Sequence, residues 1–565
     1  MNQLQRPPIH PLWGLPLHVY LTCTNNQAPI LLPHLDDINN SLELLSTGEP
    51  TCEALELCLS LSGSQSELKL IMRQGLLPGC MAALRRYCNE NPLITHAFGL
   101  LCLRMLALIT QVALLECVNP QNLTSADDGV YSHSALTRNV ALVVQSWMAP
   151  KYDYPMKQKR HLRDLQWFED SVTNQLTCLP KVGGMTSNDI EFLLNTLSAN
   201  SELCQHLFRT FDFQGYCALL FVVWQKLLRI NPIISQAAQL GNLVFRYWIR
   251  AYKIEHGLLR YMFMWSVGRL RDAGSPLRLT ANSEGDLRAV VEAFIDKTYV
   301  PDLPSMDSMA THDVAGLTDF VVDAFKPEVY DMAIPVLETL LSRVWVEIED
   351  GDPPDNEAII RLTNYSLRLL SRKFLKDLDW AALLALLLDE IDLINLLGRV
   401  LLLHLDVSGD ETRFNPIVLF GQRVTAIMRA LRECAPELVA YSFNEKLDDW
   451  LKTFRWISSQ HIAGTDLEPM QSQLRRKDVW MEIGAALGYD DMLLPCANPR
   501  CAGGEYATLV CEICRNVAYC SVDCHMSHWS TSGRDEHCRT CRRNSKQIDR
   551  EYDGETSSTT GELLT

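Results

Sequence analysis

The chain has 565 residues, of which 47% are hydrophobic and 21% charged, and its formal net charge is −17. This length exceeds what one hydrophobic core holds and predicts two to four structural units, and the composition is globular rather than disordered. The acidic balance argues against general binding to nucleic acids or to anionic membranes, because affinity for phosphates comes from Lys and Arg.

Residues 1–35 are punctuated by prolines, and we expect them to be irregular. They lack the apolar core that a secretory signal needs, so we expect an intracellular protein of the cytoplasm, the nucleus or both. Within them the string PILLP occupies residues 29–33. Taken alone, these five residues predict a proline-bounded approach to the first helix.

Residues 36–490 are expected to form an α-helical body, with subdivisions near 149–187 and 300–312. Leu, Ile and Ala return at intervals of three and four residues, and no period-two alternation persists over several strands. The fold class is therefore all-α, either an armadillo- or HEAT-like superhelix or an irregular helical domain. No fixed repeat near 40 residues supports the first alternative over the second.

Individual helices can be predicted where the pattern is strong. They are expected near 377–406, 415–433, 436–454 and 473–487. In SQSELKLIMRQGLLPG we expect Ser66 to cap a helix and Gly79, after Pro78, to end it. The longest apolar runs, Ala97–Val118 and Ala381–Val407, contain charged residues and are predicted to be buried core helices rather than membrane spans.

The 19 cysteines are unevenly placed: eleven are scattered over residues 1–495, and eight lie between Cys496 and Cys541. In a reducing compartment such a dense cluster favours metal over disulfides. The candidate ligands form close pairs, namely Cys496 with Cys501, Cys511 with Cys514, Cys520 with Cys524, and His537 with Cys541. Zinc takes four such ligands at tetrahedral angles, so these eight predict two Zn²⁺ ions that supply much of the segment's folding free energy.

The residues around these pairs resemble the MYND-type zinc finger. The match includes the C-x2-C of Cys511 and Cys514, the Tyr-Cys-Ser of 519–521, Cys524, the His-Trp of 528–529 and the closing His537-x3-Cys541. In that family the pairs interleave. The resemblance therefore implies that one zinc is held by Cys496, Cys501, Cys520 and Cys524, and the other by Cys511, Cys514, His537 and Cys541.

Three departures from the family pattern leave some assignments open. The first pair is separated by four residues, His525 stands where the family often has Gln, and the segment between Trp529 and His537 is long. If Ser521 capped a short helix, His528 would share a face with Cys524 and become an alternative ligand to His537. Cys538, which forms Cys-x2-Cys with Cys541, is another alternative.

The other side chains of the finger are expected to have simpler roles. We expect His525 on the surface. Trp529 has two interpretations, packing in the small core or contact with a bound peptide, and Tyr519 is the second candidate for either role. The resemblance implies that the finger docks short proline-containing peptides, often P-x-L-x-P, and PILLP at 29–33 has that form.

The expected function is that of an adaptor or scaffold rather than an enzyme. Eight protein ligands would close both zinc sites, and neither phosphate-binding glycine motifs nor hydrolase motifs occur, so no catalytic residue and no small-molecule substrate is inferred. The predicted finger would bind proline-containing peptides and the helical body a second partner, in transcriptional regulation or ubiquitin-ligase recruitment. The alternative is an enzyme, either a ubiquitin ligase through the finger or a methyltransferase-like activity in the body.

Residues 542–565 are polar and are expected to be disordered.

Overall fold

A computed structural model of the chain divides into two compact units, Met1–Thr339 and Leu340–Thr565. The structure describes residues 9–24, 35–118 except 64 and 94, 140, 183–205 except 203, 215–281 except 231, 283–299, 309–349, 355–370, 380–403, 416–459, 467–488, 496–498, 501, 509–511, 517–530, 537 and 541. The predicted subdivision at 149–182 and 300–308 and the tail at 542–565 lie outside these residues. The predicted domain boundaries stay predictions.

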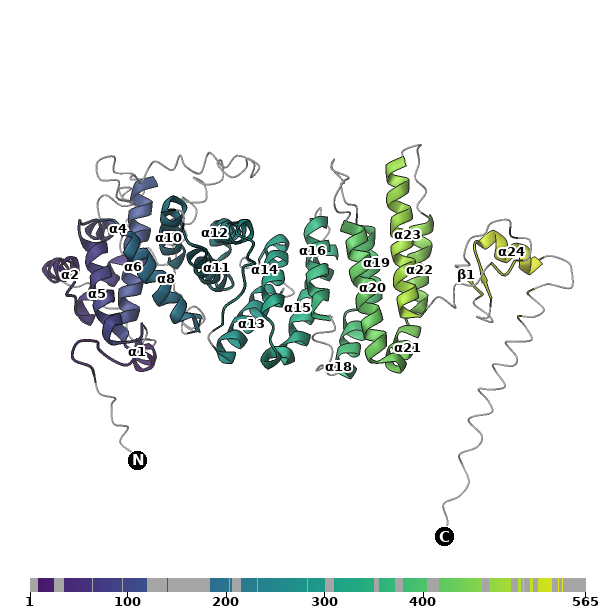
Figure 1. Cartoon of the computed structure of the whole chain (residues 1–565), viewed down its shortest axis with the longest axis horizontal. Coiled ribbons are helices and arrows are strands. Elements are labelled where there is room, and N and C mark those ends of the chain that lie inside the picture. The colour runs from purple at the N-terminus through teal and green to yellow at the C-terminus, as the bar shows by residue number, and fades with distance from the viewer. Residues whose placement is uncertain are drawn as a thin grey trace, which may run out of the picture. The chain divides into compact units, whose positions relative to one another are not determined.

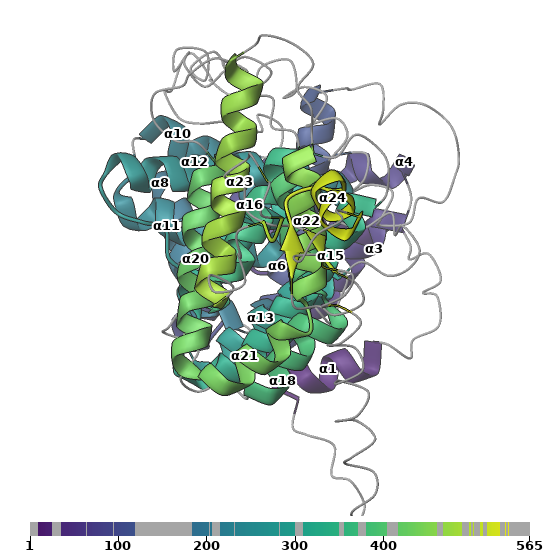
Figure 2. The ribbon, with the colours of Figure 1, turned by 90° about the vertical axis from the view of Figure 1, so that its right-hand side faces the viewer.

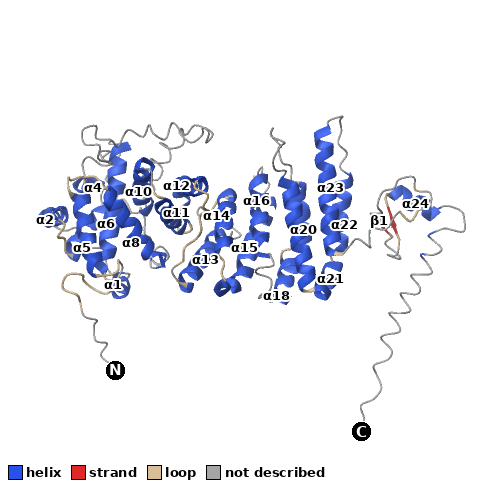
Figure 3. Cartoon of the chain, in the orientation of Figure 1, coloured by secondary structure: helices blue, strands red, loops and turns tan. Residues whose placement is uncertain are grey.

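Both units are built from helices, and the two short strands described lie near the C-terminus (Figures 1 and 3). The first unit contains α1 (Leu17–Thr24), α2 (Leu35–Thr47), α3 (Cys52–Ser60), α4 (Gln65–Leu68), α5 (Leu76–Glu90), α6 (Ala97–Val118), α8 (Ser187–Ala199), α10 (Tyr216–Ile230), α11 (Ile234–Trp248), α12 (Lys253–Asp272), α13 (Glu284–Thr298) and α14 (Thr311–Ala324). The unit boundary falls within α15 (Ala333–Glu349).

The second unit continues with α16 (Asn356–Ser366), α18 (Trp380–Ala385), α19 (Leu393–Leu402), α20 (Pro416–Cys434), α21 (Pro436–Asn444), α22 (Leu447–Ser459), α23 (Leu467–Leu487), β1 (Leu509–Val510), β2 (Ala518–Tyr519) and α24 (Val522–Ser530). The all-α class is confirmed. Its superhelical variant stays a prediction.

The N-terminal residues are more ordered than their prolines predict. Within the region expected to be irregular, α1 follows Pro16, whose carbonyl accepts hydrogen bonds from the amides of Val19 and Tyr20. The strand-like residues before α1 pair with the start of α6, since the Leu17 amide donates to the Thr95 carbonyl and the Ala97 amide to the Leu15 carbonyl. Trp13, 3% exposed, packs edge-on against Tyr87 and Phe98.

The helix α6 is the long apolar core helix of the first unit. Its residues Ala97–Glu116 have a mean hydropathy of 2.1 and would be long and apolar enough to cross a membrane. In the structure 94% of the apolar window is buried, and α3, α5 and α10 pack against it. This burial agrees with the prediction of a core helix for Ala97–Val118.

A buried ion pair joins α11 to α13. Arg246 and Asp286 both have no measurable exposure, and the guanidinium binds the carboxylate through two contacts, of 2.6 Å from Nη1 to Oδ1 and 2.8 Å from Nη2 to Oδ2. Arg246 Nη2 also donates to the Thr280 carbonyl at 2.8 Å. Because each charge depends on the other for its solvation, this pair fixes the position of α13.

His256 in α12 makes the first unit sensitive to acid. Its ring is 4% exposed and lies 3.1 Å from the Ala251 carbonyl, to which Lys297 also donates at 2.6 Å. Burial, and then the Lys297 charge, lower the pKa of His256 to about 3. In the unfolded chain His256 has an ordinary pKa and binds a proton below about pH 6.5. In the folded chain it stays neutral until about pH 3. Between these values acid therefore favours the unfolded state.

We expect the stability of α12 to fall by about 2 kcal/mol between pH 7 and pH 5 through this histidine alone. His256→Gln cannot titrate and should lose that part of the pH dependence. Hydrogen exchange of the α12 amides, corrected for the intrinsic exchange rate, measures the difference between the two proteins. An equal fall in both proteins would show that His256 is not the source.

In the second unit, α20 packs against α16 and α23, and α22 packs against α19 and α23. Figure 2 shows α22 and α23 side by side. A Cβ on Gly421 would lie 2.5 Å from Val479 Cγ1, so the glycine permits α20 and α23 to approach closely. On the other side of α23, Trp480 Nε1 donates to the Trp450 carbonyl at 3.0 Å and the two rings stack. These contacts form the core of the unit.

Two of the predicted helices are interrupted. The one expected over 377–406 is α18, then a π-helical turn at Leu386–Glu390, and then α19. Asp392 takes a left-handed φ of 50° before α19, a conformation that aspartate tolerates better than most residues. The helix expected over 436–454 is α21 and α22, separated by a turn in which the Lys446 amide donates to the Phe443 carbonyl.

Candidate metal centre

A short hairpin and a helix position the candidate ligands. β1 and β2 pair antiparallel, with Leu509 opposite Tyr519 and Val510 opposite Ala518. Beside the hairpin, the Ala497 amide donates to the Ala518 carbonyl at 2.8 Å, which brings Cys496 to β2. The helix α24 then begins at Val522, and Ser521 caps it, as predicted, by accepting from the Cys524 amide at 3.1 Å.

The first cluster contains Cys496, Cys501, Cys520 and Cys524, whose sulfur atoms all lie within 4.8 Å of one another. Cys520 Sγ is 3.4 Å from Cys501 Sγ and 3.4 Å from Cys524 Sγ. A disulfide would need a separation of about 2.0 Å, whereas four sulfurs at about 2.3 Å from one tetrahedral metal are roughly 3.8 Å apart. The four thiols are half-buried and are spaced to hold one metal ion.

The second cluster contains Cys511, His537 and Cys541, which are all buried. Cys511 Sγ and Cys541 Sγ are 3.6 Å apart. The fourth ligand that the sequence assigns here, Cys514, lies outside the described residues, as does the alternative Cys538. The structure therefore brings together seven of the eight predicted ligands, in the two groups that the resemblance implies.

The protonation behaviour of these groups depends on close packing of the thiols. Burial raises the pKa of Cys520, and hydrogen bonds with the thiols of Cys501, Cys524 and Cys496 raise it further. A hydrogen bond from Ser521 lowers the pKa of the neighbouring Cys524, and one from Cys520 lowers it further. Four thiolates this close repel one another strongly, so a cation between them is what allows all four to ionise.

His537 suits the role of a neutral ligand. Burial lowers its pKa, and the neighbouring His528 and His525 lower it further. A neutral imidazole has a lone pair for a metal ion, whereas a protonated one has none. His537 is 4% exposed and is the histidine that lies with Cys511 and Cys541.

His528, the alternative ligand, is placed elsewhere. Its Nδ1 is 3.0 Å from the hydroxyl of Tyr519, so this nitrogen is engaged in a hydrogen bond. His528 does lie one turn after Cys524 in α24, as expected. Of these two residues, only Cys524 belongs to a ligand cluster in the described part of the chain. Sequence spacing alone did not separate His528 from His537.

Aromatic rings fill the space beside the second cluster. The Tyr519 ring centroid lies 4.7 Å from that of His525 and 5.8 Å from that of His537, and Trp529 lies 5.6 Å from His537. His525, expected on the surface, is half-buried, and its Nε2 is sealed from solvent. Tyr519 has no measurable exposure and packs in this core, and its role in peptide contact stays a prediction. Trp529 is half-buried against this core.

No protein-family model matches the chain, and neither a curated protein nor a solved structure matches it. The assignment therefore depends on the residues and their geometry. Two clusters of cysteine and histidine side chains can hold metal ions, and they are compatible with a small C-terminal zinc finger.

Proposed function

We propose that residues 493–541 fold around two zinc ions as a MYND-type finger, and that the protein is an intracellular adaptor without enzymatic activity. The finger docks short proline-containing peptides, and the helical body binds a second partner. The observation that carries this proposal is the alternation of the clusters along the chain. Cys496 and Cys501 belong to the first, Cys511 to the second, Cys520 and Cys524 to the first, and His537 and Cys541 to the second.

Zinc is the metal that fits these ligands. Thiolates with or without one imidazole, at tetrahedral spacing, are the ligand sets of structural zinc sites. Four thiolates around Zn²⁺ leave a charge of −2, which weakens its ability to polarise a substrate or a bound water. This charge supports a structural metal and a binding role rather than catalysis.

The outer face of α24 supports peptide docking. Val522 and Met526 are one turn apart and are 61% and 56% exposed, and Trp529 continues the same helix face. Such an apolar stripe on a small, metal-stabilised domain offers a surface for proline and leucine side chains. Val522 and Met526 therefore join Trp529 as candidate contacts for the peptide.

A labelled peptide spanning residues 27–35, which contains PILLP, tests the proposal by fluorescence anisotropy with the full-length protein. We expect saturable binding that Met526→Glu weakens at least tenfold, because a carboxylate would enter the apolar stripe. Ser527→Glu adds the same charge to a different face of α24 and should leave binding unchanged.

Two results would contradict the proposal. One is equal binding of a peptide in which both prolines are replaced by alanine, which would remove the specificity for proline. The other is formation of ubiquitin chains by the full-length protein without any added ligase, which would replace the adaptor with an enzyme.

A further inference from the structure

Arg476 in α23 is a buried cation without a counter-ion. Three arginines are buried among the residues that the structure describes, at 0% exposure for Arg246, 6% for Arg343 and 7% for Arg476. Arg246 pairs with Asp286, and Arg343 with Glu347, each at 2.6 Å. In the described part of the chain Arg476 forms neither a hydrogen bond nor an ion pair, and its Nε is sealed from solvent. Burial of an unpaired charge is costly, so this arrangement requires an explanation.

The position of Arg476 follows from helix geometry. At 100° per residue, Arg476 shares one face of α23 with Val479, Trp480 and Ile483, which are 5%, 0% and 0% exposed. Val479 packs on Gly421 of α20, and Trp480 packs on Trp450 of α22. Arg476 thus lies about one turn closer to the N-terminus of α23 than Val479 and Trp480, on the same face of the helix.

The end of the guanidinium is accessible. The Nε atom of Arg476 has no hydrogen-bond partner and is sealed from solvent. The two Nη atoms are not sealed in this way, so they keep some of the 7% exposure of the residue. The stem is held by the surrounding core while the paired N–H groups face solvent. This geometry is prepared for a planar anion, because two parallel N–H groups match the two oxygens of a carboxylate.

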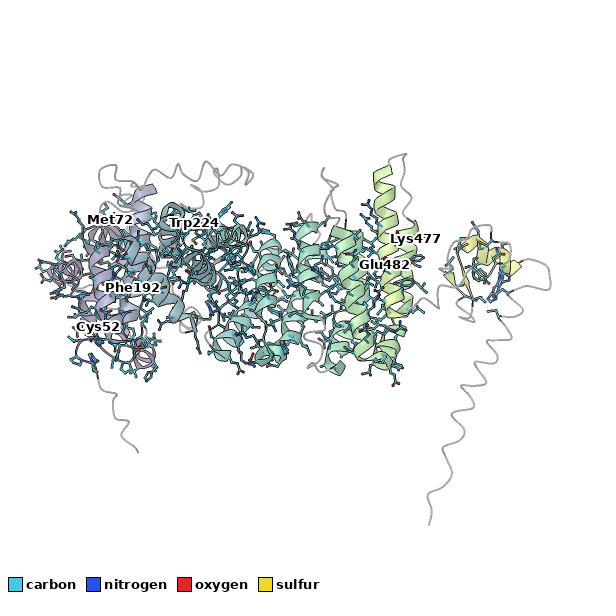
Figure 4. All side chains as sticks on the ribbon, in the orientation of Figure 1. Cys52, Met72, Phe192, Trp224, Lys477 and Glu482 are labelled. Carbon is cyan, nitrogen blue, oxygen red and sulfur yellow. The ribbon has the colours of Figure 1, made fainter. Side chains whose placement is uncertain are left out.

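The neighbouring charges favour a small anionic group over a polyanion. Arg475 is exposed, and the Lys477 ammonium lies 5.6 Å from the centre of the Phe454 ring. Asp478 and Glu482 are exposed on the opposite side of α23, and Figure 4 labels Lys477 and Glu482 on this helix. With a net charge of −17 for the whole chain, an extended phosphate backbone would be repelled, whereas a single carboxylate would not.

We propose that Arg476 anchors a binding site for a single carboxylate of an otherwise neutral peptide segment in a partner protein. The carboxylate supplies the counter-ion that Arg476 lacks among the described residues, and it pairs with the two Nη groups. Burial lowers the pKa of Arg476, which agrees with the cost of a buried guanidinium that an anion would reduce. This site lies in the helical body and does not depend on the finger.

Fluorescence anisotropy of a labelled, C-terminally amidated hexapeptide with one glutamate among neutral residues tests the site with the full-length protein. We expect Arg476→Met to weaken binding at least tenfold, and Arg475→Met, the exposed neighbour, to weaken it less than threefold. A neutral hexapeptide with a free C-terminus forms a second arm. Stronger Arg476-dependent binding of this peptide would identify a terminal carboxylate, and stronger binding of the amidated glutamate peptide a side-chain carboxylate.

The stability of the variant separates a binding residue from a structural one. Without peptide, Arg476→Met should unfold at the same or a higher urea concentration than the unaltered protein, because an apolar side chain replaces an unpaired buried charge. A lower unfolding midpoint with unchanged peptide affinity would make Arg476 structural and overturn the proposal. Absence of saturable peptide binding, or equal weakening by both variants, would overturn it as well.

Discussion

Replacing Cys541 by serine is expected to unfold residues 496–541 and to release metal from the chain. Cys541 has no measurable exposure and its sulfur lies 3.6 Å from that of Cys511, so serine would remove a ligand from the centre of the second cluster. A structural zinc contributes on the order of 10 kcal/mol to the folding of such a small domain. The packed group of buried residues here is small, comprising Cys511, Tyr519 and Cys541, and cannot replace that contribution.

Metal content per chain, measured by mass spectrometry under native conditions, gives the outcome directly. We expect two zinc ions in the unaltered protein and one or none in Cys541→Ser, together with faster proteolysis between 496 and 541. Cys434→Ser alters an exposed cysteine of α20 outside both clusters and serves as the matched control. A variant that kept the metal content and protease resistance of the unaltered protein would remove Cys541 from the ligand set.

Replacing Asp286 by alanine is expected to destabilise the first unit by about 3–5 kcal/mol. Asp286 accepts both contacts from Arg246, and no solvent reaches either side chain. The variant would leave a buried guanidinium with only the Thr280 carbonyl as acceptor at 2.8 Å. Most of the cost therefore comes from the charge that remains, not from the contact that is lost.

This origin of the cost can be tested with a second substitution. Arg246→Met combined with Asp286→Ala removes both charges and should recover a large part of the stability in urea unfolding. Asp331→Ala breaks the exposed pair with Arg288 and should have a much smaller effect, since solvent screens that pair. If the double variant were as unstable as Asp286→Ala, the cost would come from packing rather than from charge.

The ligand clusters could be predicted because their geometry is mostly local. Cys520 and Cys524 are one helical turn apart once Ser521 caps α24, and short loops join the members of the other pairs. The pattern of pairs therefore contains most of the site. The resemblance assigns His537 and leaves His528 as an alternative. The spacing of the ligands could not separate the two, because the choice depends on the contact between Tyr519 and His528, which spacing does not encode.

The all-α class could also be predicted from periodicity, but the positions of helix ends could not. Pro78 and Gly79 were expected to end a helix, yet both lie inside the first turn of α5, where proline is tolerated. The backbone of α2 passes so close to Gly79 that a Cβ at this position would lie 2.0 Å from the Leu45 carbonyl oxygen. Only glycine fits there. That reason is a tertiary contact, and it appears in the sequence only as an apparent helix breaker.

The pairing of the N-terminal residues with α6 has a consequence for the order of events during synthesis. His10 to Leu17 are made about 80 residues before the Thr95–Phe98 region that they pack against. At roughly 5–20 residues per second, Trp13 waits on the order of 4–16 s without its partners Tyr87 and Phe98. This segment therefore folds only after residues made well behind it have emerged, and until then its aromatic side chain is accessible to chaperones.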